Sequence, residues 1–254
     1  GEVDFAEIGG AQAIMRSRAR GLDGVIIGAI SNATNYQIVG SKSTRTLDDM
    51  KGKIVGVTGA GAFSDFAMRI FLRRKGIDPD RDVTLRAIGG SNLRAGALEK
   101  GLVAAAPFAP DDTVRLTRLG FPMLANLSDT LVIPQTILTS RVDFLEKNPE
   151  TSKRFLKALI LGIQLAKFNK DDAIKAGFEA KLQGEIELVN QAYDLYAPAL
   201  SSDLSVNVPG LQFMLDEDKR NGLVDGTFTL ERVVNDKTLK LAQQELRAEG
   251  RLKP

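Results

Sequence analysis

Short apolar runs alternate with segments of helical periodicity along the first half of the chain. Residues 54–57 form an apolar run of strand length, and residues 83–88 alternate between apolar and polar side chains, as a half-buried strand does. In 63–71 the apolar positions recur at intervals of three and four, the spacing of one face of an amphipathic helix. Residues 93–100 predict another helix, with Ser91 as its N-cap. Strands and helices that alternate with short loops predict parallel α/β units.

Similar segments flank this region on both sides. Residues 2–8 alternate apolar and polar side chains and predict a strand, which is followed by a helix over 11–20. Residues 131–140 predict a further strand. From Asn148 onward helical periodicity dominates, beginning with a helix over 150–168, so we expect a helical C-terminal tail.

The stretch 51–65 joins a strand to a helix through a run of small residues, and the rest of the chain is organised around it. Side chains as small as those of 58–62 let a ligand or another backbone approach closely. The first N–H groups of the following helix have no partner inside the helix and carry partial positive charge. Strand, glycine turn and helix together predict a cradle for an anion or a polar ligand.

Three other interpretations of this turn have to be compared with the cradle. A P-loop requires Gly-Lys-Ser/Thr where Ala62-Phe63 stands, which excludes it. A dinucleotide fingerprint would run from Gly59 to Ser64, but Asp80 and Asp82 precede the next strand instead of ending it, which disfavours a ribose site. A plain strand-to-helix turn without a ligand stays open beside the small-molecule cradle.

Composition excludes several classes of site. The chain has 254 residues, enough for one large domain or two lobes, and a net charge of +2 with acids and bases interspersed. It contains no Cys, His or Trp, so disulfides, thiol nucleophiles, Ser-His-Asp catalysis and most zinc sites are excluded. No apolar run approaches the ~18 residues of a transmembrane helix. We therefore expect no nucleic-acid partner, membrane span, metal or cofactor.

Four segments follow, in order and spacing, a pattern of short motifs known from one protein family. Gly1-Glu2-Val3-Asp4-Phe5-Ala6 resembles a Gly-x-Val-Asp-Phe-Ala strand, and TLDDMKGKIVGV at 46–57 resembles the Leu-Lys-Gly-Lys-x-Ile-Gly-Val entry to the second lobe. GIDPDRDV at 76–83 resembles Gly-Leu-Asp-Pro-x-x-Asp-Val, and Asn148-Pro149-Glu150 resembles a helix start of that family. Together the four segments resemble the substrate-binding proteins of bacterial ABC transporters, specifically the nitrate/sulfonate/taurine group, which includes thiamine-precursor-binding relatives.

Two departures from that pattern limit what is carried over. The family opens with a strand–helix–strand unit ahead of the segment that matches Gly1, and we expect this unit to be missing here. The family also often has Gly-x-Val-Asp-Ala where the chain has GLVAA at 101–105, so that Ala104 replaces the acid. A hydrogen bond made by that acid in relatives is therefore not transferred to this chain.

The resemblance implies a two-lobed, type II periplasmic-binding fold of the α/β class. Each lobe would be a mainly parallel sheet flanked by helices, with the helical tail at the C-terminus. Lobe one is expected at 1–40 and 139–254, and lobe two at 41–138. The ligand would be trapped between the lobes, which close by a hinge motion.

Loops at the carboxyl ends of the strands are the expected binding site, because ligands of open α/β sheets bind there. They offer hydroxyls, amides and bare N–H groups, with Phe63 and Phe108 as apolar walls. Phe108 is expected in a loop after a strand over 103–106, with a lobe-surface plug as the alternative role, and core packing is the alternative for Phe63. The predicted ligand-binding residues are Gly9, Gly10, Ala11, Gln12, Asn32, Asn35, Thr58, Gly59, Ala60, Gly61, Ala62, Phe63, Ser64, Ser91, Asn92, Pro107 and Phe108.

Basic side chains are missing from the central loops of this predicted site. No Lys or Arg occurs between Thr58 and Ser64 or in 9–12. An anion is therefore expected to rest on helix N-termini and on the hydroxyls of Thr58, Ser64 and Ser91. Arg94 is the nearest basic residue by sequence, and its loss is expected to cost less affinity than the loss of the Ser64 hydroxyl.

The resemblance implies the solute-binding component of a bacterial ABC uptake system, without catalytic residues. Its ligand would be a small organic anion or polar aromatic, and its protein partner the transporter permease. Its location would be the periplasm, or an extracytoplasmic surface with a lipid anchor, with the signal segment not visible in this sequence. An enzyme of the thiamine-precursor or menaquinone-pathway type is one alternative, although the pyrimidine synthases of that group rely on His and Cys. A ligand-sensing protein without a transporter is the other.

Overall fold

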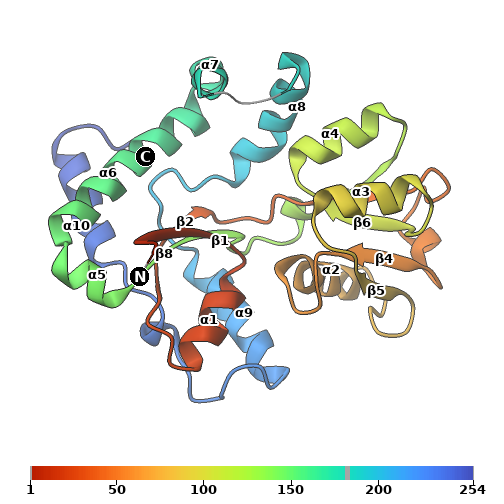
Figure 1. Cartoon of the computed structure of the whole chain (residues 1–254), viewed down its shortest axis with the longest axis horizontal. Helices are drawn as coiled ribbons and strands as arrows, with labels where there is room; N and C mark the ends of the chain where they lie inside the picture. Colours follow the sequence, from red (N-terminus) through yellow and green to blue (C-terminus); the bar gives the residue numbers. More distant parts are fainter. Residues whose placement is uncertain (1, 181–183, 254) are drawn as a thin grey trace. The chain divides into compact units, whose positions relative to one another are not determined.

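The computed structural model describes residues 2–180 and 184–253, and the chain groups into two compact units (Figure 1). The first unit comprises Gly1–Ala33, Ile133–Leu182 and Ala199–Pro254. The second comprises Thr34–Val132 and Gln183–Pro198. The lobe limits expected from the sequence remain a prediction.

The sheet of the first unit is built from β1 (Phe5–Gly9), β2 (Val25–Ser31) and β8 (Thr136–Ser140), in the order β1-β8-β2. β8 is antiparallel to both neighbours, which differs from the mainly parallel sheet that was expected. Periodicity predicts a strand but not its direction. Gly9 and Ser31 both pair with Thr136, so β1 and β2 end at the same edge.

Helices of the first unit pack in two groups. One group is α1 (Ala11–Ala19) and α9 (Val208–Arg220), joined by Arg16, which donates to both carboxylate oxygens of Asp218 at 2.8 and 2.7 Å. The other group is α6 (Pro149–Phe168), which packs against α5 (Val142–Lys147), α7 (Lys170–Glu179) and α10 (Lys237–Ala248). There are also 3₁₀ turns in this part of the chain. η3 (Ala197–Ala199) spans the point in the sequence where the chain passes from the second unit back to the first, and η4 is Leu230–Arg232.

The sheet of the second unit has the strand order β5-β4-β6-β3-β7. Its strands are β3 (Gln37–Gly40), β4 (Ile54–Val57), β5 (Thr84–Ala87), β6 (Ala105–Phe108) and β7 (Met123–Asn126). β4 is parallel to β5 and β6, whereas β3 is antiparallel to β6 and β7. As a result, β3 begins and β7 ends at the edge where β4, β5 and β6 end.

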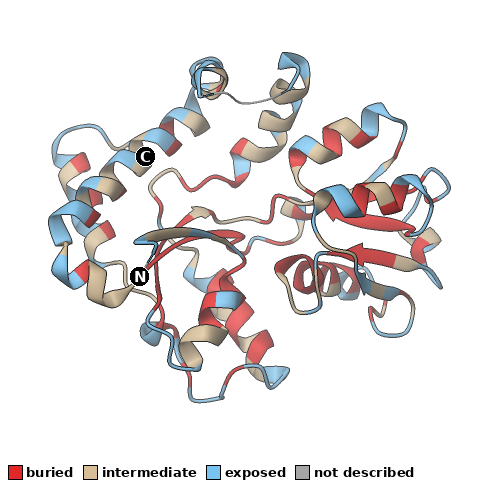
Figure 2. Ribbon diagram, viewed as in Figure 1, coloured by how far each residue is buried: buried red, intermediate tan, exposed pale blue. Residues whose placement is uncertain are grey.

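Helices cover both faces of this second sheet. They are α2 (Phe63–Arg74), α3 (Ser91–Glu99) and α4 (Pro110–Arg118), and α8 (Ile186–Tyr196) packs against α4. The 3₁₀ turns of this unit are η1 (Asp48–Met50) and η2 (Leu127–Asp129). α3 and α4 lie along one face and α2 along the other (Figure 1). Leu98, Leu116, Ala106 and Phe108 share a buried cluster between the sheet and the α3–α4 layer (Figure 2).

Strand β6 corrects the prediction that Pro107 and Phe108 lie in a loop. The strand begins two residues later than the predicted strand over 103–106 and continues to Phe108. A proline in an inner strand removes a backbone donor. It is tolerated here because the pairing with β4 stops at Ala105, and Pro107 lies opposite Ile38 of β3.

The start of α3 corrects the prediction that Ser91 is an N-cap. The helix begins at Ser91, and Gly90 occupies the cap position without a side-chain hydrogen bond. Gly89 has φ +106°, a conformation that favours glycine and lets the chain turn from β5 into the helix. The Ser91 hydroxyl instead faces Arg94 one turn later, with Ser91 Oγ 3.4 Å from Arg94 Nη2.

Candidate functional site

The loops predicted to bind a ligand in the second unit meet at one edge of its sheet. They follow β4, β5 and β6 and lead into α2, α3 and α4. Gln37, at the start of β3, pairs with Phe108 on one side and with Asn126 on the other. The fold therefore brings 58–64, 89–92 and Phe108 to the same edge.

The loop between β4 and α2 is fastened by two side chains from the first turn of α2. Ser64 Oγ accepts the N–H of Thr58 at 2.9 Å, and a carboxylate oxygen of Asp65 accepts the N–H of Gly61 at 2.8 Å. Ser64 and Asp65 are both buried, so these bonds are shielded from water. The turn is thus held in one conformation before any ligand arrives. Thr58 and Ala60 remain exposed on it, while Gly59, Gly61 and Ala62 are half-buried.

Arg94 of α3 reaches into this edge, and only 2% of its surface is exposed. Its Nη1 donates to Thr58 Oγ1 at 2.7 Å and to the Gly89 carbonyl at 2.6 Å. Its Nε donates to the Pro107 carbonyl at 3.3 Å. The guanidinium therefore contacts the ends of three neighbouring strands.

The charge of Arg94 has no salt-bridge carboxylate among the residues that the structure describes. Burial lowers the pKa of the guanidinium below its ordinary value, and the charges of Tyr36 and Asp112 oppose this shift. Burial likewise raises the pKa of Tyr36, with Arg94 acting in the opposite direction. A buried charge without a paired charge is unfavourable. An anion next to Arg94 would supply the missing counter-charge.

The two aromatic residues predicted as pocket walls are both buried. Phe108 is fully buried in the core cluster, with the Arg94 guanidinium carbon 5.5 Å from its ring centroid. Phe63 is 7% exposed in the first turn of α2, and its ring lies 6.0 Å from that of Tyr36. Core packing therefore accounts for most of the surface of both rings, and their roles as pocket walls stay predictions.

In the first unit, the predicted residues 9–12 run from the last residue of β1 into the first turn of α1. Gly10 has φ +95° and donates its N–H to the Gln135 carbonyl at 2.6 Å. Ala11 and Gln12 are buried, and neither amide atom of Gln12 has a hydrogen-bond partner among the described residues. A role of this segment in ligand binding remains a prediction.

Asn32 and Asn35 come from one predicted loop but belong to different units. The Asn32 amide donates to the Ser205 carbonyl at 2.6 Å and accepts the N–H of Asn207 at 2.9 Å. Asn32 therefore holds the loop ahead of α9, a role that the sequence did not indicate. Asn35 is buried in the second unit, and its carbonyl accepts a hydrogen bond from Gln37 Nε2 at 3.1 Å.

Three residues at the second-unit edge escaped the sequence-based prediction: Tyr36, Gln37 and Asn126. Tyr36 directly precedes β3 and Gln37 begins it, so both lie at this edge only if β3 begins where β4, β5 and β6 end. Only the antiparallel direction of β3 provides that arrangement. Arg94 was identified as the nearest basic residue, but its burial inside the cradle was not predicted.

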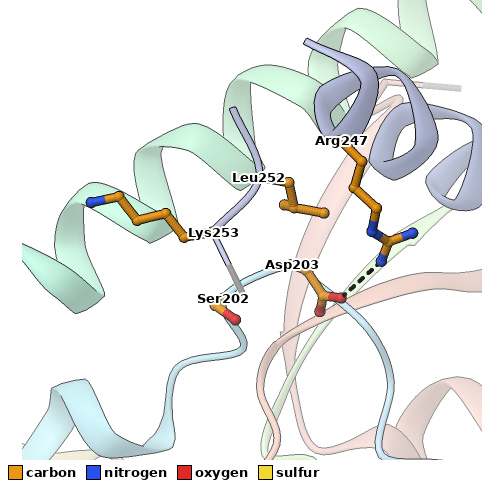
Figure 3. Close-up of a pocket in the computed structure, with 5 residues that line it drawn as sticks. All are labelled: Ser202, Asp203, Arg247, Leu252 and Lys253. Atoms are coloured by element: carbon orange, nitrogen blue, oxygen red, sulfur yellow. Dashed lines mark ion pairs between the residues drawn. The ribbon is translucent and has the colours of Figure 1, made fainter. Parts of the chain in front are cut away.

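A cavity of about 300 Å³ lies in the first unit. It is lined by Ser202, Asp203, Arg247, Leu252 and Lys253 (Figure 3). Arg247 and Asp203 form a 4.0 Å ion pair there, and Lys253 points its ammonium group away from the other side chains (Figure 3). None of the predicted site residues lines this cavity.

Comparison with known families identifies the group to which the chain belongs. Residues 1–173 match the family model described as NMT1/THI5 like. The chain belongs to the NMT1/THI5-like family. This confirms the resemblance stated from the sequence motifs. No curated protein matches the chain by sequence.

Solved structures share the fold of this NMT1/THI5-like protein at low sequence identity. The periplasmic sulfonate-binding protein SsuA from Methylobacillus flagellatus KT is 18% identical, with a TM-score of 0.77, over 100% of this chain and 78% of that one. SsuA from Xanthomonas axonopodis pv. citri, bound to MOPS, is 20% identical, with a TM-score of 0.72, over 95% and 80%. The desulfurization enzyme DSZB is 14% identical, with a TM-score of 0.67, over 95% and 85%. These matches confirm the type II periplasmic-binding fold, which binding proteins and an enzyme share.

Two absences hold for the described part of this NMT1/THI5-like chain. No group of three or more carboxylates is placed to hold a metal ion. No helix combines the length and hydropathy required to cross a bilayer.

Proposed function

We propose that the chain is the solute-binding component of an ABC uptake system and that its solute is a small organic anion. The observation that carries this proposal is the buried guanidinium of Arg94, at the carboxyl ends of β4, β5 and β6. Two features support it further. The first turns of α2 and α3 begin at the same edge, and helix N-termini favour negative charge. The SsuA relatives are described as sulfonate-binding and periplasmic.

In this proposal Arg94 pairs with the acid group and the neighbouring loops supply neutral donors. Nη1 and Nε of Arg94 already have protein acceptors, and Nη2 has Ser91 Oγ at a long 3.4 Å. Because a guanidinium nitrogen of this type carries two hydrogens, Nη2 is the atom best placed to donate to an anion. The exposed Thr58 and the half-buried Ser91 line the approach to it.

We propose binding without catalysis, in the periplasm or at the extracytoplasmic surface, with a transporter permease as the protein partner. The permease and the location come from the family, and the DSZB match keeps an enzyme on this fold as the alternative. The chain has no His or Cys, on which the pyrimidine synthases of the related group rely. A ligand-sensing role would differ in lacking a permease, and gene neighbours that encode a permease and an ATPase would argue against it.

Calorimetry with a panel of short alkanesulfonates and carboxylates tests the proposal directly. We expect at least one anion to bind the wild-type protein and to lose tenfold or more affinity in Arg94→Gln. Arg86→Gln is the matched control, because Arg86 lies on β5 of the same sheet and is exposed. Failure of every anion to bind, or equal binding by Arg94→Gln and wild type, would refute the proposal.

A further inference from the structure

Gln37 presents a buried acceptor whose orientation is fixed by its neighbours. The side chain is fully buried at the start of β3. Its Nε2 donates to the Asn35 carbonyl at 3.1 Å and to Asn126 Oδ1 at 3.2 Å. Asn126 Oδ1 also accepts the N–H of Ser128 at 3.3 Å, so that atom is an acceptor. Both partners of Nε2 are therefore acceptors, which only the NH₂ group of the amide can bond. The Gln37 amide cannot be flipped to exchange Nε2 and Oε1.

This arrangement leaves the oxygen of Gln37 without a partner. Oε1 has no hydrogen bond among the residues that the structure describes. Buried polar atoms in folded proteins nearly always have a partner, so an exception requires an explanation. Among the described residues, the hydroxyls of Thr34 and Thr113, buried in the same unit, also lack hydrogen-bond partners. Thr113 lies on α4, which packs against β3.

Gln37 and Arg94 share one face of the sheet edge. Gln37 lies directly opposite Phe108 in the β3–β6 ladder, and opposite residues of a ladder point to the same face. Arg94 lies over the Phe108 ring at 5.5 Å. Its charge also acts on Tyr36, the residue before Gln37. The unpaired acceptor therefore lies on the same face of the sheet edge as the Arg94 guanidinium, and both are neighbours of Phe108.

We propose that Gln37 is a specificity-determining residue for the solute bound at Arg94. Its Oε1 can only accept a hydrogen bond, so it selects an organic anion that carries a hydroxyl or amino donor close to its acid group. A site with a buried acceptor rejects the analogue that lacks the donor, because that acceptor is then left unpaired. This inference rests on the proposed function and adds the second polar group of the solute to it.

Matched pairs of small acids separate the donor from the acid group. We would titrate the wild-type protein with 2-hydroxyethanesulfonate and 1-propanesulfonate, and with glycolate and propanoate. Within each pair a methyl group replaces the hydroxyl at nearly constant size. We expect the hydroxylated member of a bound pair to bind about tenfold more tightly or better.

Variants assign that preference to a single atom. Gln37→Met removes the acceptor at constant length, and Gln37→Asn withdraws the amide by one methylene. Both should bring the ratio of affinities towards one. Arg86→Gln, the exposed control on β5, leaves Gln37 and its partners in place, so it should keep the preference.

Each outcome has one meaning. Equal binding of both members by the wild type overturns the role of Gln37, leaves the organic-anion function intact and indicates that an ordered water satisfies Oε1. A hydroxyl preference that persists in a folded Gln37 variant overturns it as well. Absence of binding for all four acids refutes the organic-anion function for these acid classes, and the inference falls with it.

Discussion

Arg94 on α3 donates from Nη1 to Thr58 Oγ1 at 2.7 Å, so a side chain of one helix holds the loop that leads into another. The same guanidinium donates to the carbonyl of Gly89, which follows β5, and to the carbonyl of Pro107, which lies in β6. Helix N-termini and the hydroxyls of Thr58, Ser64 and Ser91 were expected to form the anion cradle without a basic side chain. The structure adds a buried cation to them, and this changes which substitution should matter most.

The ranking of two substitutions is therefore reversed relative to the expectation from sequence. Arg94→Gln should weaken anion binding about tenfold or more relative to wild type, because it removes the charge that pairs with the anion. This loss should exceed that of Ser64→Ala. Arg94→Lys should fall between wild type and Arg94→Gln, since a lysine keeps the charge but cannot bond three strand ends with a planar fork. Calorimetry with the tightest-binding anion measures the affinity of Arg94→Gln, Arg94→Lys and Ser64→Ala against wild type.

Salt provides a second test of the same prediction. Buried charges are screened far less than exposed ones, so affinity should change little between low and high ionic strength. A larger loss in Ser64→Ala than in Arg94→Gln would contradict a direct role of Arg94. A steep salt dependence would place the anion on exposed lysines or arginines instead.

Ser64→Ala should act mainly on stability. It leaves the Thr58 N–H without its 2.9 Å acceptor at a site where Ser64 is 1% exposed. Loss of a partner for a buried donor costs about 1–2 kcal/mol of unfolding free energy, which urea titration resolves. Ser17→Ala in α1 is the control, since alanine there should change stability by about 0.5 kcal/mol or less. Equal stability of both variants would show that the Thr58 N–H finds another acceptor.

Two glycine-to-alanine substitutions should have opposite signs. A Cβ at Gly40, the last residue of β3, would lie 2.3 Å from the Thr44 carbonyl oxygen and 3.1 Å from Leu124 Cδ1. We expect Gly40→Ala to cost about 3 kcal/mol, because the backbone must move. A Cβ at Gly162 meets nothing within 4 Å in the middle of α6, so Gly162→Ala should stabilise by about 0.5–1 kcal/mol. Thermal melting of both variants checks the signs.

The contact between α6 and α10 should make stability depend on pH at the acid end. Lys153 and Lys157 place their ammonium groups 2.7 and 3.0 Å from the Glu245 carboxylate. Their hydrogen bonds hold the pKa of Glu245 below its ordinary value of 4.5. A depressed carboxylate pKa contributes stability above the ordinary value and loses it as the pH falls through the lowered one. Glu245→Gln should therefore be less stable than wild type near neutral pH.

At a pH below both values that difference should vanish. Urea titrations of wild type and Glu245→Gln near pH 7 and near pH 2 measure it. Glu146→Gln on α5 is the matched control, because Glu146 is exposed. If the difference in unfolding free energy between Glu245→Gln and wild type stays constant with pH, then packing, and not charge, holds α6 and α10 together.

Elements with a strong local pattern were predicted close to their observed bounds. β4 spans Ile54–Val57 as expected, and α2 begins at Phe63 and ends just before Gly76, whose φ of +74° suits the end of a helix. Pro107 and Phe108 were misplaced because local pattern cannot tell an apolar loop from a buried strand. Asn32 was predicted in a ligand-binding loop, and its hydrogen bonds to Ser205 and Asn207 were not predicted because those partners lie more than 170 positions away.

By itself the sequence determined where most strands and helices lie, which family the motifs match, and which catalytic groups are excluded, because these depend on residue type and short-range periodicity. Only the tertiary structure decided which way β3 and β8 run, and hence that Gln37 and Asn126 reach the edge where β4, β5 and β6 end. It also decided that Arg94 is buried against Thr58, 36 positions away. The reason is physical: strand direction and long-range contacts follow from how whole elements pack, and a local pattern of apolar and polar residues contains no information about either.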